Sequence, residues 1–341
     1  MHESETEDQA IQRQEIQQKL AKLPLVAAEI AKVIVGQRQI VDELLISVLA
    51  GGHCLLEGVP GLAKTLMVST LAQSLELEFR RVQFTPDLMP SDIIGTEILE
   101  EDHVTGKRFF KFQKGPVFTN ILLADEINRT PPKTQAALLE AMQERRVSYA
   151  GEVHTLPRPF FVLATQNPVE QAGTYPLPEA QLDRFLMFIR VPYPTEAEEI
   201  EILSRTTGNH EVQLKTILNA TDMITLQSLV REVGISEVLL TYIARLVRTT
   251  RPDESNDEMV KEYVRWGSGP RAGQALVLCA KARALMEGHF AVTIEDIHRV
   301  AKAVLRHRIL LNFQAEASGI TTENVIDRLL KSVSLPSSPL D

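Results

Sequence analysis

The stretch from Glu57 to Thr65 reads E-G-V-P-G-L-A-K-T, a glycine-containing turn that ends in a lysine and a threonine. A short apolar run, His53 to Leu56, precedes the turn, and a segment with helical spacing, Leu66 to Leu75, follows it. This order of strand, turn and helix is typical of a phosphate-binding loop, in which backbone N–H groups and a helix N-terminus face phosphate oxygens. Lys64 would contact the β- and γ-phosphates, and the Thr65 hydroxyl would bind Mg²⁺.

One position departs from the usual phosphate-loop pattern, G-x-x-x-x-G-K-[ST]. Ala63 stands where the second glycine is expected, and Gly61, two residues earlier, can supply the flexibility that the turn needs. The alternative is an ordinary Gly/Pro turn before a core helix, because short patterns also arise by chance. The residues that we predict to contact the nucleotide are Gly58, Val59, Pro60, Gly61, Leu62, Ala63, Lys64, Thr65 and Leu66.

Two adjacent carboxylates follow another apolar run, in the sequence N-I-L-L-A-D-E-I-N from Asn120 to Asn128. Ligands gather at the carboxyl ends of strands in parallel α/β sheets, so we expect Asp125 and Glu126 to face the nucleotide. Asp125 would hold Mg²⁺, directly or through water, and Glu126 would orient and polarise the attacking water. The alternative is a solvent-facing acidic turn, and the phosphate loop upstream favours the catalytic interpretation.

The pattern of apolar runs predicts the elements that position these residues. Five runs read as strands, with helical segments between them, at residues 53–56, 79–84, 120–125, 160–164 and 186–191. This alternation predicts an α/β fold with a doubly wound, five-stranded parallel sheet. After Pro192 to Thr195 the pattern is helical throughout, which predicts a smaller all-α domain.

We divide the chain accordingly into an N-terminal helical extension (1–32), an α/β nucleotide-binding domain (33–194), an all-α domain (195–331) and a flexible Ser/Pro-rich tail (332–341). In the extension, Pro24 is expected to end or restart an amphipathic helix. Two β-hairpins are predicted inside the α/β domain, at about residues 95–114 and 147–156.

Composition narrows the class of protein. The 341 residues carry a formal charge of -9, which argues against a general nucleic-acid coating role. Cys54 and Cys279 lie in apolar runs, as expected of buried free thiols in a reducing compartment. No apolar run approaches the roughly 20 residues of a membrane span, and the N-terminus is too polar for a signal peptide. We therefore expect a soluble, cytoplasmic protein.

Longer strings around these residues resemble the MoxR branch of the AAA+ ATPases. The resemblance runs from about Val33 to Leu330, and the alanine at position 63 is itself typical of MoxR-like loops. It is carried by E-G-V-P-G-L-A-K-T, Q-F-T-P-D-L-M-P-S-D-I-I-G, A-T-Q-N-P and T-Y-P-L-P-E-A-Q-L-D-R-F. The implied fold is a phosphate-loop AAA+ sheet domain with a helical lid.

The resemblance also implies roles for five further residues. Asn167 resembles sensor 1, which helps to place the attacking water, and Arg184 resembles the arginine finger that reaches into a neighbour's site. Arg271 resembles sensor 2, which would act from the lid on the same subunit's phosphate. Val35 and Gly36 match the segment that lines the adenine pocket. Taken singly, either arginine could instead be a surface residue, Arg184 in an ion pair and Arg271 at a helix end.

The implied activity is hydrolysis of ATP, with Mg²⁺, coupled to chaperone-like remodelling, maturation or activation of a partner complex. The implied assembly is a homo-oligomer, a hexameric ring by analogy, and family members work with proteins that carry von Willebrand factor A domains. The two hairpins would face the pore or the client. Phe109, Phe110 and Phe112 could form a client-gripping surface or pack the hairpin, and we favour packing. Two other functions stay open: a DNA-acting AAA+ motor, and a nucleotide-gated scaffold with little turnover.

Overall fold

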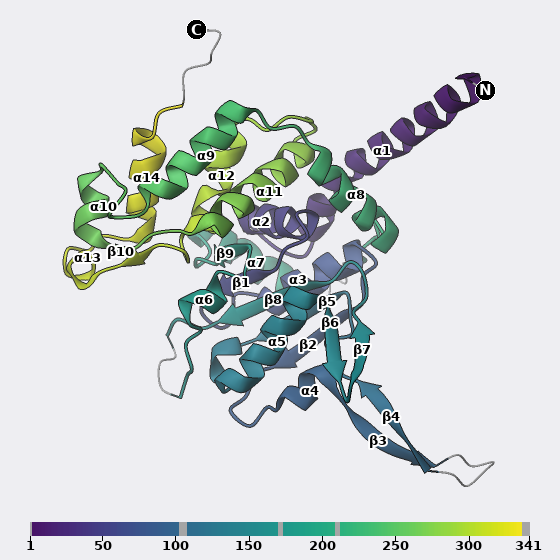
Figure 1. Ribbon diagram of the computed structural model, residues 1–341. Coiled ribbons are helices and arrows are strands. Elements are labelled where there is room, and N and C mark those ends of the chain that lie inside the picture. Colours follow the sequence, from purple (N-terminus) through teal and green to yellow (C-terminus); the bar gives the residue numbers. More distant parts are fainter. Residues whose placement is uncertain (1, 102–107, 170–172, 209–211, 336–341) are drawn as a thin grey trace.

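A five-stranded parallel sheet forms the centre of the molecule in the computed structural model, which describes residues 2–101, 108–169, 173–208 and 212–335 (Figure 1). The strand order is β2-β5-β8-β1-β9. The bounds are Cys54–Glu57 for β1, Phe79–Gln83 for β2, Ile121–Asp125 for β5, Phe161–Gln166 for β8 and Met187–Arg190 for β9. All four neighbouring pairs are parallel, which confirms the predicted doubly wound α/β sheet.

Both faces of this sheet are buried, because side chains of each strand alternate between two hydrophobic clusters. In β1, Cys54 and Leu56 pack in one cluster and Leu55 packs in the other. Helices α2 (Arg38–Leu49) and α3 (Lys64–Ser74) contribute to the first cluster, and α5 (Pro132–Glu144) contributes to the second. The short elements η1 (Ile127–Arg129) and α6 (Glu179–Leu182) follow β5 and β8 in the chain.

The N-terminal helix α1 runs without interruption from His2 to Ile30, and its first half extends away from the body of the molecule (Figure 1). The expectation that Pro24 ends or restarts the helix is therefore wrong. Proline removes one helical hydrogen bond and crowds the preceding turn. Burial compensates here, because Leu23, Val26 and Ile30 flank Pro24 and are at most 2% exposed. Tertiary packing thus overrides the local signal.

Two antiparallel hairpins leave the α/β domain next to each other (Figure 1). The first pairs β3 (Gly95–Glu101) with β4 (Arg108–Lys114) after the short helix α4 (Pro90–Ile94), and the second pairs β6 (Arg146–Tyr149) with β7 (Glu152–Thr155). The Phe112 ring stacks on His154 at 4.3 Å, so it joins the hairpins, whereas Phe109 and Phe110 are exposed. The part of the predicted first hairpin at residues 102–107 lies outside the described residues.

The C-terminal part is helical, as predicted, apart from one small addition. Its elements are α7 (Glu196–Thr206), α8 (Ala220–Glu232), α9 (Glu237–Thr249), α10 (Glu258–Tyr263), α11 (Pro270–Met286), α12 (Ile294–Leu305), α13 (Phe313–Ala317) and α14 (Thr322–Ser332). The addition is a two-stranded sheet of β10 (Val264–Trp266) and β11 (Leu310–Leu311). Within the described residues, no helix combines the length and hydropathy that crossing a membrane requires.

Candidate active site

The predicted phosphate loop joins the carboxyl end of β1 to the N-terminus of α3. Gly61 and Ala63 both have positive φ angles, 88° and 54°, so the alanine adopts the left-handed conformation that glycine favours at this position. No side chain caps α3. The first N–H groups of a helix have no intrahelical partner, so those of α3 are suited to bind phosphate oxygens.

Lys64 bends back over its own loop and donates a hydrogen bond from Nζ to the Gly58 carbonyl oxygen at 2.5 Å. Burial lowers the pKa of Lys64, whereas the nearby charges of Asp125 and Glu126 raise it. The lysine and the two acids therefore share one site, as the sequence predicted. A phosphate oxygen can replace the Gly58 carbonyl as the partner of Nζ.

Asp125 lies at the end of β5, where neighbouring strands hold its carboxylate. Thr165 Oγ1, from β8, donates to Asp125 Oδ1 at 2.6 Å, and Arg81 Nη2, from β2, donates to Oδ2 at 2.6 Å. Thr165 Oγ1 also accepts the backbone N–H of Glu126 at 2.9 Å, and Thr165 is fully buried. One hydroxyl therefore positions both acids.

Glu126 has a left-handed backbone, with φ at 57°, which is uncommon for a residue other than glycine. Its carboxylate accepts hydrogen bonds from Gln83 Nε2 at 2.7 Å and from Arg129 Nη1 at 2.8 Å. Both donors contact Oε2, so among the described residues Oε1 is the oxygen that remains to accept a hydrogen bond from a water molecule.

Asn167 comes directly after β8, so it lies at the same edge of the sheet as the two acids. It is 6% exposed, and its Oδ1 accepts the backbone N–H of Val169 at 3.1 Å. This contact orients the amide so that Nδ2 is left for a ligand or a water molecule. The predicted sensor 1 residue therefore lies at the same end of the sheet as Asp125 and Glu126, and its role stays a prediction.

Val35 and Gly36 also belong to this edge. A Cβ atom built on Gly36 would lie 2.0 Å from Glu198 Oε1, so the loop packs directly against the first turn of α7. That helix follows β9, and Val191, at the end of β9, lies 3.0 Å from a Cβ built on Gly58. The segment predicted to line the adenine pocket is therefore connected to the phosphate loop through β9 and α7.

The described residues contain no group of three or more His, Cys, Asp or Glu side chains arranged to hold a metal ion. A Mg²⁺ site at Thr65 and Asp125 therefore has few protein ligands. This donor set fits Mg²⁺, which usually keeps several waters and is completed by substrate phosphates.

The two predicted arginines lie at the opposite edge of the sheet. Arg184 and Arg271 line a pocket of about 270 Å³ together with Gly51, Gly52 and His53, which precede β1. Arg184 also precedes β9, which runs parallel to β1 with Met187 beside Cys54. Both arginines are thus at the amino ends of these strands, whereas Lys64 follows the carboxyl end of β1.

Asp183 fixes the loop at this edge. Its carboxylate pairs with buried Arg308 at 2.7 Å and lies 4.0 Å from Arg271 Nη1. The alternative that Asp183 and Arg184 form a surface ion pair is therefore not realised. The expectation that Arg271 serves the phosphate of its own subunit is corrected as well, because the sheet separates it from its own phosphate loop. Sequence order alone could not reveal at which edge α11 begins.

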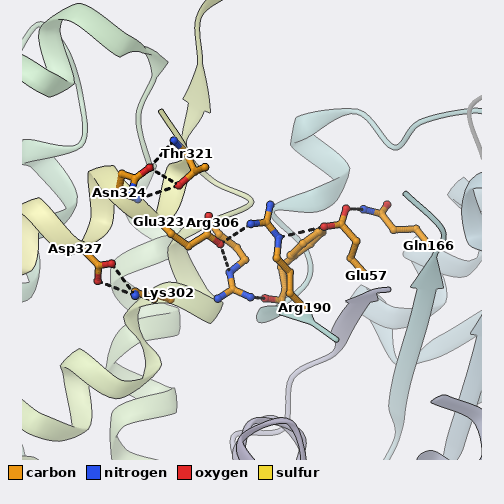
Figure 2. A network of polar contacts seen from close by, with 10 residues as sticks. Glu57, Gln166, Arg190, Lys302, Arg306, Thr321, Glu323, Asn324 and Asp327 are labelled. Carbon is orange, nitrogen blue, oxygen red and sulfur yellow. Dashed lines mark hydrogen bonds and ion pairs between the residues drawn. The ribbon is translucent and has the colours of Figure 1, made fainter. Parts of the chain in front are cut away.

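A polar network connects the carboxyl edge of the sheet, where the phosphate loop lies, to the lid (Figure 2). We did not predict its members from the sequence. Arg190, the last residue of β9, contacts Glu57 at 3.2 Å and Glu323 of α14 at 2.7 Å. Glu323 also pairs with Arg306 at 3.3 Å, and Glu57 accepts a hydrogen bond from Gln166 at 3.1 Å. Glu57 and Gln166 directly precede the phosphate loop and Asn167.

Comparison with known proteins gives consistent matches. The ATPase family associated with various cellular activities (AAA) matches residues 53–187, and an AAA lid domain matches residues 256–329. Chaperone MoxR1 of Mycobacterium tuberculosis is 47% identical over 309 residues, which cover 90% of this chain and 81% of that protein. Protein MoxR of Methylorubrum extorquens is 32% identical, covering 83% of this chain and 86% of that protein.

A solved structure extends the similarity to three dimensions. The crystal structure of a candidate ATPase from Cytophaga hutchinsonii superposes with a TM-score of 0.89 at 45% identity, covering 97% of this chain and 99% of that one. The phosphate loop, the adjacent acids Asp125 and Glu126 and the helical lid are all features that agree with membership of this family. The chain belongs to the MoxR family of AAA+ ATPases.

Proposed function

We propose that the chain hydrolyses ATP to ADP and phosphate at a composite site formed by two adjacent copies. The supporting observation is that the charged groups lie at opposite edges of the sheet: Lys64 and Glu126 at one edge, Arg184 and Arg271 at the other. Phosphoryl transfer needs both sets near the γ-phosphate. The edge of one copy's sheet where the strands begin would meet the edge of the next copy's sheet where the strands end. Such a head-to-tail contact forms a closed ring when the rotation between neighbouring copies returns to the first copy. We propose a hexameric ring.

At the carboxyl edge, the residues of one copy would bind the nucleotide and activate water. The N–H groups of the loop and Lys64 would hold the β- and γ-phosphates, and the segment at Val35 and Gly36 would bind adenine. Asn167 would position the attacking water, and Glu126 would polarise it through Oε1, the oxygen that Gln83 and Arg129 do not contact. Mg²⁺, held by Thr65 and Asp125, would neutralise charge on the phosphates.

At the amino edge, the two arginines of the neighbouring copy would stabilise the charge that develops on the γ-phosphate. In well-studied enzymes of this kind an arginine supplied by a neighbour raises the rate by about 10³–10⁵. The geometry supports such a role for Arg184, because Asp183 pairs with Arg308 and Arg271 and leaves Arg184 exposed. Turnover should therefore depend on assembly.

The product of this activity would be motion, used to remodel or activate a client protein complex in the cytoplasm. The polar network of Glu57, Arg190 and Glu323 gives a route from the loop to the lid, and the exposed Phe109 and Phe110 give the hairpins an apolar surface. By family analogy the partner carries a von Willebrand factor A domain. The chaperone name of the Mycobacterium tuberculosis relative supports a role of this kind.

Two substitutions test the proposed chemistry. Lys64→Ala should abolish ATP binding, because the loop loses the cation that contacts the phosphates. Glu126→Gln should keep binding and reduce steady-state hydrolysis by at least about 10²-fold, since the amide cannot polarise water. Turnover at the wild-type rate in Glu126→Gln would contradict the assignment of Glu126 as the residue that polarises water.

Two results would favour the alternative functions. Stimulation of the wild-type ATPase rate by DNA would favour a DNA-acting motor. A negligible ATPase rate at every protein concentration would favour a nucleotide-gated scaffold.

A further inference from the structure

A second pocket, of about 160 Å³, lies beside the one that contains Arg184 and Arg271, and the two share Gly51 and Arg145. Three arginines line it: Arg145 at the end of α5, Arg158 in the segment before β8, and Arg231 in the last turn of α8. None of its lining residues is acidic. The pocket lies between the α/β domain and the C-terminal helical part, to which α8 belongs.

These arginines are not neutralised by partners in the described parts of the chain. Arg145 Nη2 donates to the Gly51 carbonyl oxygen at 2.9 Å, and neither Arg158 nor Arg231 is ion-paired with a carboxylate among the described residues. Burial lowers the pKa of Arg145, and the charges of Arg158 and Arg231 lower it further, which reflects how close the three cations are. Lys281 does not line the pocket but adds a cation near Arg231, since its Nζ donates to the Arg231 carbonyl oxygen at 3.0 Å.

Helix dipoles offset only part of this charge. The carboxyl ends of α2, α5 and α8 meet at the pocket, through Gly51, Arg145 and Arg231. Each helix end carries at most about half a negative charge. Three such ends against three guanidinium groups leave an excess of roughly one and a half positive charges. An anion is therefore the ligand that this pocket favours.

The shape of the donors indicates which anion. A guanidinium group presents parallel N–H donors that match the oxygens of a phosphoryl group. At about 160 Å³ the pocket is smaller than the roughly 300 Å³ at which sites for drug-sized ligands begin, so it suits a single oxyanion and not a whole nucleotide. We propose that Arg145, Arg158 and Arg231 form a phosphoryl-binding site, occupied by inorganic phosphate or by the terminal phosphate of a polyphosphate.

Binding there would join the two parts of the molecule. Arg145 and Arg158 come from the α/β domain and Arg231 comes from α8 in the C-terminal helical part, so one anion contacted by all three holds α8 against the α/β domain. Gln227 Nε2 of α8 already donates to the Val48 carbonyl oxygen of α2 at 2.7 Å beside the pocket. Phosphate would thus stabilise one position of α8 relative to the α/β domain, and its departure would release that helix.

Titration calorimetry with inorganic phosphate and pyrophosphate tests the site in a Lys64→Ala background, which removes the competing phosphate loop. Ionic strength is held constant with sodium chloride. We expect saturable binding at one site, weakened at least about tenfold by Arg158→Ala or by Arg231→Ala and partly restored by Arg158→Lys. Arg80→Ala is the matched control, because Arg80 is an exposed arginine of β2 that pairs with Glu78; it should bind as the background does.

Thermal unfolding of the protein with intact Lys64 provides a second measurement that does not depend on that background. Phosphate should raise Tm, and Arg231→Ala should reduce this shift while Arg80→Ala keeps it. Phosphate binding no tighter than chloride, or equal binding by Arg158→Ala, Arg231→Ala and Arg80→Ala, would overturn the proposal. Because nucleotide is absent, failure here is distinct from failure of the proposed ATPase activity.

The source of the phosphoryl group is resolved by the initial ATPase rate of Arg158→Ala in phosphate-free buffer. A rate that falls together with phosphate binding indicates the terminal phosphate of a nucleotide held by a neighbour. An unchanged rate, with lost phosphate binding, indicates free phosphate. Either result supports a phosphoryl site.

Discussion

At the scale of single residues, Thr165 explains how two adjacent carboxylates are held in different positions. Its hydroxyl donates to Asp125 Oδ1 and accepts from the Glu126 backbone N–H, so it fixes the turn that separates the two side chains. Arg81 holds Asp125 from one neighbouring strand, and Gln83 holds Glu126 from the same strand. The acids are thus positioned by β2 and β8, the strands on either side of β5.

Replacing the Thr165 hydroxyl should lower the ATPase rate even when the volume of the side chain is kept. Thr165→Val keeps the volume but leaves the Glu126 N–H and one Asp125 oxygen without their partner in a buried site, which should cost about 1–3 kcal/mol of unfolding free energy. We expect the ATPase rate to fall at least about tenfold, because the acids lose their fixed positions. Urea unfolding and steady-state hydrolysis measure the two effects. Thr165→Ser is the control, and a Thr165→Val protein as active as Thr165→Ser would contradict this role.

The acids and the phosphate loop could be predicted from the sequence, whereas the side chains that hold them could not. Lys64, Asp125 and Glu126 sit at fixed offsets within local patterns, so a single stretch of chain indicates each of them. Gln83 and Thr165 contact the acids only because β2, β5 and β8 are neighbours in the sheet. Strand order depends on the whole fold, and no local pattern carries it.

At the scale of secondary-structure elements, Arg190 is the residue where three parts of the molecule meet. It contacts the end of β1 through Glu57 and the start of α14 through Glu323, as Figure 2 shows. Its side chain is 49% exposed, so these contacts add little to stability, less than about 1 kcal/mol. Their effect should instead appear in nucleotide binding.

We expect Arg190→Ala to weaken ATP binding by up to about fivefold, the equivalent of roughly 1 kcal/mol, while Tm changes little. The reason is that Glu57, freed from Arg190, directly precedes the phosphate loop. Equilibrium binding of a fluorescent ATP analogue measures the effect. Arg80→Ala, which removes an arginine of similar exposure from its pair with Glu78, should leave affinity unchanged. Equal ATP affinities in Arg190→Ala and Arg80→Ala would contradict a role of Arg190 in ATP binding.

His53 makes the junction of α5, β1 and β8 sensitive to pH. Its Nδ1 accepts the Val162 N–H at 2.9 Å, and Nε2 lies 3.1 Å from the Met142 carbonyl oxygen, so a neutral ring protonated at Nε2 satisfies both. Burial lowers the pKa of His53 to about 4. The unfolded chain, with a pKa near 6.5, therefore binds the proton first as pH falls.

The contribution of neutral His53 to the free energy of unfolding should be complete above about pH 6.5. It should be lost progressively as pH falls towards 4, by roughly 3 kcal/mol at most. Urea midpoints at pH 7 and pH 5 measure the loss, and His53→Gln should show a smaller difference between them. Burial also lowers the pKa of His307, so part of the pH dependence should persist in that variant. A difference as large as that of the wild type would show that His53 is not its source.

At the scale of the whole molecule, the decisive feature is the placement of the lid. The sequence predicted five strands, two hairpins and a helical C-terminal part, because each has a local periodicity that survives in the fold. It could not predict that α11 begins at the amino edge of the sheet, where Arg271 lies beside Asp183. That placement comes from contacts between distant segments, among them buried Arg308 with Asp183 and with the Phe185 carbonyl oxygen.

The placement of Arg271 predicts that it acts on a neighbour's nucleotide. Arg271→Ala and Lys64→Ala subunits should each be inactive alone and regain ATPase activity when mixed and reassembled. A site is then restored wherever the intact loop of one variant meets the intact Arg271 of the other. If Arg271 served its own subunit, mixing would restore nothing, because no subunit in the mixture would carry both residues.

The same design applied to Arg184 tests the central claim most directly, that two adjacent copies build each active site. Arg184→Ala subunits should bind ATP without hydrolysing it, and Lys64→Ala subunits should not bind it. An equal mixture, dissociated and reassembled, should recover roughly one quarter of the wild-type rate, since half of the loops are intact and half of their neighbours carry Arg184. A mixture that stays as inactive as its two components would contradict the account.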